Sequence, residues 1–542
     1  MFTRFLCIIF LLSFIVPLRG QSDYSEEIKK YTAGLPFEIG VIKTPAFKDK
    51  IYIITDFGAV PDGQILNTDA FNKAMTKCSE NGGGKVIVPP GLWITGPIRL
   101  QSNVDLHLER GALILFSRNH EDYPIVRYPE KGYSVQSPVS GIDLENVAIT
   151  GEGILDGAGD TWRPVKKAKL TPSQWQKLMN SGGYFDSKNS IWYPSQEAYD
   201  GLENIKLLKG KKDISEINYI PYRESMRPYM VMLINCKNVF LNDITIENSP
   251  KFALYPIRCS NVIFRKVKIN NEWWAQNGDA MDISACKNVL IYNCTINAGD
   301  DGICMKAGSI KNYGKPVLEN IVIADCVVYH AHGGFVIGSE TDGGIKNISV
   351  RDCNFIGTDI GLRFKSAKDR GGLVENISID GIYMKDIANE AVLFDFSYEQ
   401  NLDGNKNKEE KLPIFRNFRM NKIVCSGAES AVYINALPDS PVKDISINNS
   451  YFETTSGVNV SFASSVSFDN VGFKIKGDNL VILDQSDKIN FSNITFSENV
   501  KSFISLKGDK TSEIRITGTN LSKLNAPVKY SQDVNSNSIL IQ

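Results

Sequence analysis

The tetrapeptide Asn288-Val289-Leu290-Ile291 and its copies along the chain decide the fold. In each copy a polar residue, an Asn and a Val or Ile are followed by alternating apolar and polar residues, which is typical of short strands. The six clearest copies are 23, 27, 32, 27 and 29 residues apart. They contain Asn238, Asn261, Asn288, Asn320, Asn347 and Asn376, with earlier copies at Asn103 and Asn146 and weaker ones near Lys443, Ser465 and Lys488.

This period indicates a stacked array of repeats. Because each repeat holds short strands and no helix, we predict an all-β fold, a single-stranded right-handed parallel β-helix in which one repeat forms one coil. Successive coils would pair as parallel strands about 4.8 Å apart. The repeated Asn would stack as a ladder that satisfies backbone groups of the turns. A β-propeller needs longer repeats of about 40–45 residues, so the period disfavours it.

The open edge of the first coil needs a cover. Asn67-Thr68-Asp69 predicts the start of a helix, with Asn67 or Thr68 as the N-cap, and Gly82-Gly83-Gly84 predicts its end. One face of that helix holds Phe71, Ala74, Met75 and Cys78. We therefore predict an N-terminal capping helix.

The first 21 residues have the pattern of a secretory signal peptide. Arg4 precedes the mainly apolar run Phe5–Val16, which is shorter than the roughly 20 residues that span a bilayer. We expect residues 22–542 to form the mature β-helix domain, exported to the periplasm or the medium and not held in a membrane. The chain has 60 Lys or Arg against 61 Asp or Glu, so no excess charge favours nucleic acid or an anionic membrane as partner.

Nine of the ten cysteines remain after the predicted cleavage, and an odd number cannot all pair within the chain. Cys236, Cys259 and Cys286 precede the same Lys/Ser-Asn-Val pattern. Cysteine at one position of a repeat is expected as a small buried side chain in a stack. A disulfide framework and metal ligation are the alternatives.

Ionisable residues recur at one position of four consecutive coils. Asp300 follows Asp279 by 21 residues, His332 follows Asp301 by 31, and Arg363 follows His332 by 31. Each interval is close to one coil, so these side chains and Lys365 are expected to form a strip roughly 15 Å long on one face. The glycines that flank Asp300 and Asp301 permit the turn that would bring both carboxylates to the same site.

Neighbouring carboxylates cannot all ionise easily, so a proton donor is left beside a carboxylate base. Cleavage of a glycosidic bond needs these two groups. Arg363 and Lys365, at i and i+2 of one strand, could bind a carboxylate of the substrate. The residues therefore predict an enzyme that hydrolyses an acidic polysaccharide, a uronic acid polymer, without a metal or other cofactor.

The set Asn277-x-Asp279, Gly299-Asp300-Asp301, His332-Gly333 and Arg363-x-Lys365 resembles glycoside hydrolase family 28, the polygalacturonases and their relatives. The resemblance implies a parallel β-helix and inverting, metal-free hydrolysis of α-galacturonosyl links in pectic polysaccharide. It implies Asp300 as general acid, Asp279 with Asp301 activating the water, and His332 orienting or tuning the acid. Asn277, Arg363 and Lys365 would bind the substrate.

Three positions depart from the family pattern: Gly278, Ala331 and Phe364 stand where the family usually has Thr, Gly or Ser, and Ile. None of them removes an ionisable group. A rhamnogalacturonan-type hydrolase of the same fold remains an alternative. Less favoured are a calcium-dependent β-helix of the pectate-lyase type and a non-catalytic carbohydrate-binding β-helix. We expect a monomer.

The segment from Gly159 to Met226 breaks the period and is rich in Trp, Tyr and Lys. Long insertions in a stacked array usually lie on the binding face, and Trp273 and Trp274 lie close in sequence to Asp279. Our hypothesis is that the insertion closes one end of the groove and makes the enzyme act from the chain end. The alternative is that it only shields an apolar flank.

Overall fold

The computed structural model describes residues 24–129, 131–208, 211, 214–308, 318–397 and 411–542. The signal peptide predicted for residues 1–21 lies outside them. Within the described residues no helix is long and apolar enough to cross a membrane.

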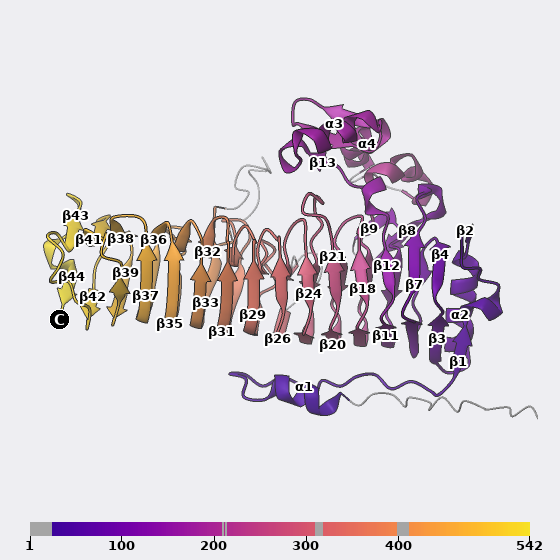
Figure 1. Ribbon diagram of the computed structural model, residues 1–542, viewed down its shortest axis with the longest axis horizontal. Helices are drawn as coiled ribbons and strands as arrows, with labels where there is room; N and C mark the ends of the chain where they lie inside the picture. The colour runs from indigo at the N-terminus through magenta and orange to yellow at the C-terminus, as the bar shows by residue number, and fades with distance from the viewer. Residues whose placement is uncertain (1–23, 130, 209–210, 212–213, 309–317, 398–410) are drawn as a thin grey trace, which may run out of the picture.

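Two long parallel sheets run the length of the molecule, which is a right-handed parallel β-helix (Figure 1). The smaller sheet carries the candidate site and has 14 strands. They are β5 (Ile98–Arg99), β10 (Val139–Ile142), β16 (Val231–Ile234), β19 (Leu254–Ile257), β22 (Met281–Ser284), β25 (Ile303–Lys306), β28 (Phe335–Ile337), β30 (Leu362–Lys365), β32 (Glu390–Asp395), β34 (Ser430–Asn435), β36 (Ser456–Ser461), β38 (Asn479–Asp484), β41 (Ser502–Lys507) and β43 (Val528–Tyr530).

The larger sheet has 25 strands and forms the remaining walls of the coils. They are β1 (Ile51–Ile53), β2 (Asp62–Leu66), β3 (Gly84–Val88), β4 (Gly91–Thr95), β6 (Val104–Leu108), β7 (Ala112–Phe116), β11 (Glu145–Gly151), β12 (Ile154–Asp156), β17 (Lys237–Asn242), β18 (Thr245–Glu247), β20 (Ser260–Arg265), β21 (Lys268–Asn270), β23 (Lys287–Tyr292), β24 (Thr295–Asn297), β26 (Leu318–Ala324), β27 (Val327–Tyr329), β29 (Ile345–Ile356), β31 (Gly372–Lys385), β33 (Pro413–Ser426), β35 (Val442–Thr454), β37 (Ala463–Ile475), β39 (Asp487–Ser492), β40 (Thr495–Phe496), β42 (Ile514–Thr517) and β44 (Ile539–Ile541).

The register between coils follows the sequence repeat. Val289 of β23 lies opposite Val262 of β20 on one side and Ile321 of β26 on the other. Equivalent residues of successive repeats therefore stack directly, and the predicted parallel β-helix is confirmed.

The predicted asparagine ladder is present. After the first Asn, each amide Nδ2 donates to the Oδ1 of the Asn one coil earlier, as from Asn320 to Asn288 at 3.1 Å and from Asn347 to Asn320 at 3.0 Å. The ladder consists of Asn103, Asn146, Asn238, Asn261, Asn288, Asn320, Asn347, Asn376 and Asn417. All nine have φ between 53° and 63°, a left-handed conformation that Asn tolerates better than most residues. We predicted that these side chains would bond to backbone groups of the turns. In the described residues their bonds instead join one side-chain amide to the next.

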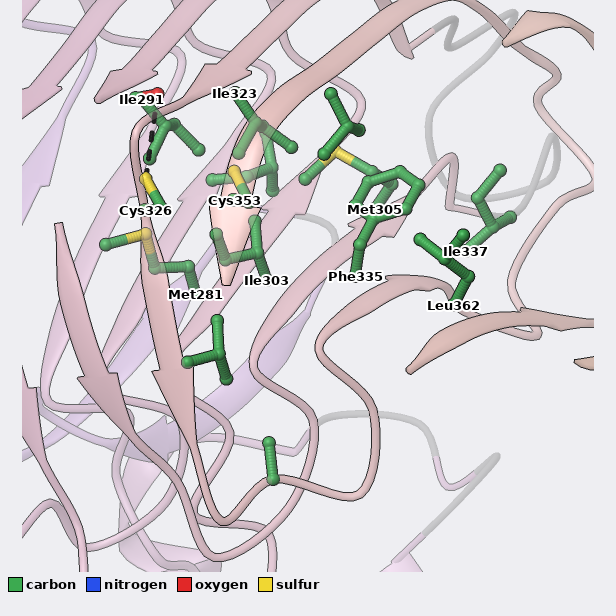
Figure 2. Close-up of a cluster of buried hydrophobic side chains, with 14 of the residues drawn as sticks. Met281, Ile291, Ile303, Met305, Ile323, Cys326, Phe335, Ile337, Cys353 and Leu362 are labelled. Atoms are coloured by element: carbon green, nitrogen blue, oxygen red, sulfur yellow. Dashed lines mark hydrogen bonds between the residues drawn. The ribbon is translucent and has the colours of Figure 1, made fainter. Parts of the chain in front are cut away.

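Aliphatic and aromatic side chains fill the interior of the coils. One continuous core extends from Ile54 to Ile516. Figure 2 shows part of it, with Cys326 and Cys353 among Ile, Met, Phe and Leu side chains. All nine cysteines of the described residues are free and buried, as the repeat analysis predicted.

The helix predicted near Asn67 is α2 (Thr68–Glu80), and its predicted apolar face is buried in the core of the coils. Asn67 occupies the N-cap position, but its side chain does not cap the helix. It is 2% exposed and bonds instead to the backbone of Val60, Ile65 and Ile94. That α2 covers the end of the stack stays a prediction.

In the described part of the chain, two segments interrupt the succession of coils. One, not predicted, is an antiparallel hairpin of β8 (Ile125–Tyr128) and β9 (Gly132–Val135), preceded by η2 (His120–Asp122). The other is the predicted insertion, which Figure 1 shows beside the stack. It contains η3 (Gly159–Thr161), β13 (Val165–Lys166), η4 (Lys167–Lys169), α3 (Pro172–Asn180), β14 (Tyr184–Asp186), β15 (Ile191–Tyr193), α4 (Gln196–Asn204), η5 (Ile205–Leu208), η6 (Glu216–Asn218) and η7 (Ile220–Ser225).

A further helix, α1 (Ser25–Thr32), lies outside the coils against the larger sheet. Its Ile28 and Tyr31 pack on outward-facing residues of that sheet, such as Leu290 and Tyr292. The remaining 3-10 turns are η1 (Ile54–Phe57) and η8 (Ser536–Ser538).

Candidate active site

The predicted residues lie where the coils enter the smaller sheet. Asp279 lies two residues before β22, and Asp300 and Asp301 lie in the turn between β24 and β25. The backbone N–H of His332 donates to the carbonyl of Asp300 at 2.8 Å, which places His332 one coil further along. Arg363 and Lys365 point from β30. The structure therefore brings the predicted strip together.

Three carboxylates form the centre of this strip. One oxygen from each of Asp279, Asp300 and Asp301 lies within 4.8 Å of the other two. The turn at Asp300 and Asp301 replaces the strand alternation that would have sent the two side chains in opposite directions. The three carboxyl groups therefore face one small region, where they can act on one substrate bond.

Asp301 is held as a carboxylate. Its Oδ2 lies 2.7 Å from Lys365 Nζ and its Oδ1 lies 3.3 Å from Arg363 Nη1. Burial alone would raise the pKa of Asp301, but the positive charges of Lys365 and Arg363 outweigh it and lower that pKa well below its usual range. Lys365 is itself only 5% exposed. The predicted binding of a substrate carboxylate by these two cations stays a prediction.

Asp279 has the opposite environment. Burial raises its pKa well above the usual range, and repulsion from Asp282 and Asp300 adds to the effect. Its Oδ1 is buried and has no hydrogen-bond partner within the described residues. A buried oxygen of this kind usually has an ordered water as its hydrogen-bond partner.

Lys306 and Asp282 belong to the site and were not predicted. Lys306 Nζ lies 2.9 Å from Asp282 Oδ1 and 3.9 Å from Asp279 Oδ2. Burial would lower the pKa of Lys306, but Asp282 and Glu340 raise it well above the usual value. Strand alternation could have identified them in the sequence. The paired strands β22 and β25 place Asp282 and Lys306 near the cluster of three carboxylates.

His332 links the acid cluster to the insertion. Its Nδ1 lies 2.9 Å from Asp300 Oδ1, and its Nε2 lies 3.0 Å from Lys169 Nζ. Because an ammonium group only donates, Nε2 accepts and Nδ1–H donates to Asp300. Asp359 Oδ2 lies 3.6 Å from Nε2. Sequence reasoning missed Lys169 and Asp359, because neither belongs to a motif.

Asn277, predicted to bind substrate, contacts another protein residue. Its Oδ1 accepts a hydrogen bond of 2.7 Å from Arg227 Nη2, and Arg227 Nη1 donates to the carbonyl of Gln276 at 2.8 Å. Arg227 therefore fixes the turn that carries Asp279, and a substrate contact of Asn277 stays a prediction.

A cavity of about 230 Å³ opens beside His332. Its lining comprises Lys169, Trp273, Gly299, His330, Ala331, His332, Gly357 and Asp359. Lys169 Nζ also lies 5.7 Å from the centre of the Trp273 ring. Trp274 packs on the core of the insertion, formed by Val165, Trp175 and Trp192. The insertion thus reaches, from one side, the coil that carries His332.

The three carboxylates could also hold a divalent cation through their oxygens. At Asp301, however, such an ion would have to displace or oppose the Lys365 and Arg363 charges. Lys365 and Arg363 already balance much of the negative charge of the three carboxylates. Carboxylates paired with protein cations in this way are what acid–base hydrolysis needs.

Comparison with known proteins agrees with this chemistry. The profile of glycosyl hydrolases family 28 matches residues 213–454, which contain all the predicted site residues. An exo-poly-alpha-D-galacturonosidase of Dickeya chrysanthemi is 28% identical over 456 residues, covering 80% of this chain and 72% of that protein. An endo-polygalacturonase of Pectobacterium carotovorum subsp. carotovorum is 24% identical over 374 residues, covering 67% of this chain and 81% of that protein.

A similar solved structure is that of a hyperthermoactive exopolygalacturonase from Thermotoga maritima, with a TM-score of 0.67 and 26% identity. The match covers 88% of this chain and 96% of that chain. Family profile, relatives and fold agree with the acid cluster, and the chain is a glycosidase that is similar to family 28 of the glycosyl hydrolases over residues 213–454.

Proposed function

We propose that this glycosidase hydrolyses α-galacturonosyl linkages in a pectic polysaccharide, polygalacturonan or a related polymer. The observation that carries the proposal is the cluster of Asp279, Asp300 and Asp301 faced by Arg363 and Lys365. The carboxylates supply acid and base for glycosidic cleavage, and cations beside them suit a substrate that bears a carboxylate. The names of the relatives support a galacturonan as substrate.

In the proposed reaction Asp300 protonates the leaving oxygen, and Asp301 with Asp279 activates the water. Asp301 is suited to a base because Lys365 and Arg363 lower its pKa. Asp279, whose pKa burial raises, holds a proton in the cluster, and transfer of that proton to Asp300 before cleavage leaves Asp279 as a carboxylate that can assist Asp301. His332 donates through Nδ1–H to Asp300 and orients it toward the bond.

We propose inversion at the anomeric carbon because of the family resemblance, since the spacing of the carboxyl groups does not indicate it. Carboxyl groups of inverting enzymes are usually about 6.5–9.5 Å apart, whereas oxygens of the three Asp lie within 4.8 Å. Proton NMR of the first product decides the point. Inversion gives the β-anomer of galacturonate first, and an α-anomer would contradict the proposal.

We also propose that the enzyme acts from the chain end. The insertion reaches His332 through Lys169, and the hairpin β8–β9 shares a small core with the insertion, formed around Tyr123, Trp162 and Met226. Two segments outside the coil therefore flank a groove that a bare β-helix would leave open at both ends.

The experiment is digestion of polygalacturonate and rhamnogalacturonan with product analysis by mass and with viscosity. The expected result is one short product from polygalacturonate at the earliest time points and slow loss of viscosity. A ladder of oligomers with rapid loss of viscosity would leave an endo-acting enzyme. Cleavage of rhamnogalacturonan alone would contradict the proposal that polygalacturonan is the substrate.

The apolar run Phe5–Val16 supports the further proposal that the protein is exported and acts outside the cytoplasm. We also propose that it acts as a monomer. Amino-terminal sequencing of the exported protein is expected to begin near Gln21 or Ser22. A product that still begins at Met1 would contradict export by cleavage.

A further inference from the structure

The column of side chains that contains Asp279 continues toward the N-terminus as aromatic rings. Strands β16, β19 and β22 pair in register. The residue two positions before each strand begins is Tyr229, Phe252 and Asp279 in turn. Tyr229 and Phe252 have ring centres 5.1 Å apart. A sugar chain that binds at Asp279 and extends in this direction would meet these two rings.

Lysines surround the rings. Lys251 Nζ lies 3.3 Å from the Tyr229 hydroxyl and 4.7 Å from the centre of the Tyr229 ring. Lys131 Nζ, from the hairpin β8–β9, lies 2.9 Å from the Tyr255 hydroxyl and 5.4 Å from the Tyr229 ring centre. Lys306 Nζ lies 4.3 Å from the Phe252 ring centre and connects this group to the acid cluster.

Within the described residues, most of these cations form no ion pair with a carboxylate. Lys306 pairs with Asp282. In the described part of the chain no ion pair joins Lys131, Lys251 or Arg227 to a carboxylate, and Arg227 donates only to neutral oxygens. Burial, with repulsion from Arg227 and Lys306, lowers the pKa of Lys251 to about 8.

Clustered cations of like charge destabilise a protein unless a partner offsets them. Lys131, Lys251 and Arg227 are all partly exposed, so a ligand can reach them. Tyr229 and Phe252 are also partly exposed, so these rings add apolar surface beside the ammonium groups that lie over them. The chemistry that fits both features is a sugar that carries a carboxylate.

We infer that Lys131, Lys251 and Arg227, with the rings of Tyr229 and Phe252, form an additional subsite for the carboxylate of a uronate on the N-terminal side of the acid cluster. The inference rests on the proposed function and adds where the next sugar of the substrate binds. The hairpin that carries Lys131 also packs Tyr128 on Met232 and Tyr255. This packing holds Lys131 beside Tyr229 and Tyr255.

The experiment measures binding by calorimetry in an Asp300→Asn background, which separates binding from turnover. The probes are trigalacturonate and its methyl ester, which lacks the charges. Lys251→Met is expected to weaken trigalacturonate binding by about tenfold or more, the scale of a charge-assisted hydrogen bond, and to change ester binding by less than about twofold. Lys131→Met is expected to act in the same direction, and Lys251→Arg to retain most of the affinity.

The matched control is Lys268→Met, which removes an exposed lysine of β21 outside the groove and is expected to leave both affinities unchanged. Equal losses for acid and ester, or no loss for either lysine variant, would overturn the subsite while leaving the proposed function intact. Failure of the Asp300→Asn protein itself to bind trigalacturonate would instead overturn the proposed function, and the subsite with it.

Discussion

Lys365 Nζ lies 2.7 Å from Asp301 Oδ2, although two coils separate the strand β30 from the turn before β25. Both side chains are buried. Removing one partner of a buried pair leaves the other charge uncompensated, and this loss is larger than for an exposed pair. Lys365 therefore controls whether Asp301 carries a charge.

Lys365→Met is expected to lower kcat/KM and to move its acidic limb to higher pH. In the native protein the pKa of Asp301 is lowered, so Asp301 stays ionised as the pH falls. Without Lys365, burial would raise that pKa and the base would be protonated at higher pH. The pH dependence of kcat/KM on polygalacturonate measures the shift.

The control for this variant is Lys346→Met. Lys346 Nζ pairs with Glu319 at 3.0 Å, but its side chain is 44% exposed and lies on the other sheet. Its removal is expected to change neither the rate nor the pH profile. An unchanged acidic limb in Lys365→Met would show that Asp301 is not the titrating base.

Asp300→Asn is expected to keep the fold and to lower kcat by at least about 10²-fold, the usual scale for a general acid. The amide cannot transfer a proton but can still accept from His332 Nδ1. Asp380→Asn, on an exposed position of β31, is the control and is expected to be fully active. Near-normal turnover by folded Asp300→Asn would remove Asp300 from the mechanism.

The asparagine ladder permits a prediction about stability. Asn320 has a φ of 61° and bonds to Asn288 and Asn347. Both Asn320→Gly and Asn320→Ala remove these bonds, but only Ala also suffers the left-handed conformation, which costs roughly 1–2 kcal/mol. Asn320→Ala is therefore expected to be less stable than Asn320→Gly by about 1 kcal/mol. Denaturant unfolding measures the difference, and equal stabilities would show that the conformation of Asn320 adds nothing.

The coil and the catalytic strip could be predicted because they depend on the repeat. Asn261, Asn288 and Asn320 mark successive coils. Counting residues from them shows that Asp279 and Asp301 lie in neighbouring coils. The period is a property of local sequence, and parallel stacking converts it directly into distances between coils.

The ion pair between Lys365 and Asp301 could not be predicted in this way. Gly333 lies one coil after Asp301, and a Cβ added there would lie 3.2 Å from Arg363 Cβ. The small size of this one residue leaves room for the cations to approach Asp301 from further along the stack. Such contacts depend on the shape of the intervening coil and not on the period.

The contacts of the insertion were also beyond sequence reasoning. Lys169 lies 163 residues from His332 in sequence, in a segment without the repeat. Its position depends on how Trp175 and Trp192 pack against Trp274. No pattern in the sequence connects these residues, so the hypothesis of a closing insertion named no contact.

Activity is expected to persist in excess EDTA. Lys306, Arg363 and Lys365 already contact carboxylates of the acid cluster, so the proposed reaction needs no ion there. The assay compares initial rates on polygalacturonate before and after chelation. Loss of activity that calcium restores, with unsaturated products, would favour the calcium-dependent lyase alternative.

The contact between Lys169 and His332 predicts that the insertion contributes to turnover. Lys169 Nζ donates to His332 Nε2 at 3.0 Å, which leaves Nδ1–H for Asp300. Lys169→Met removes this donor and is expected to lower kcat/KM by about tenfold, as for one charge-assisted hydrogen bond.

The neighbouring Lys167 lies on the same short helix, but its Nζ is 6.0 Å from the centre of the Trp175 ring and its contact is with the insertion itself. Lys167→Met is therefore the matched control and is expected to be fully active. Equal losses in both variants would mean that the insertion acts through its own stability, whereas a loss confined to Lys169→Met would tie the insertion to the catalytic histidine.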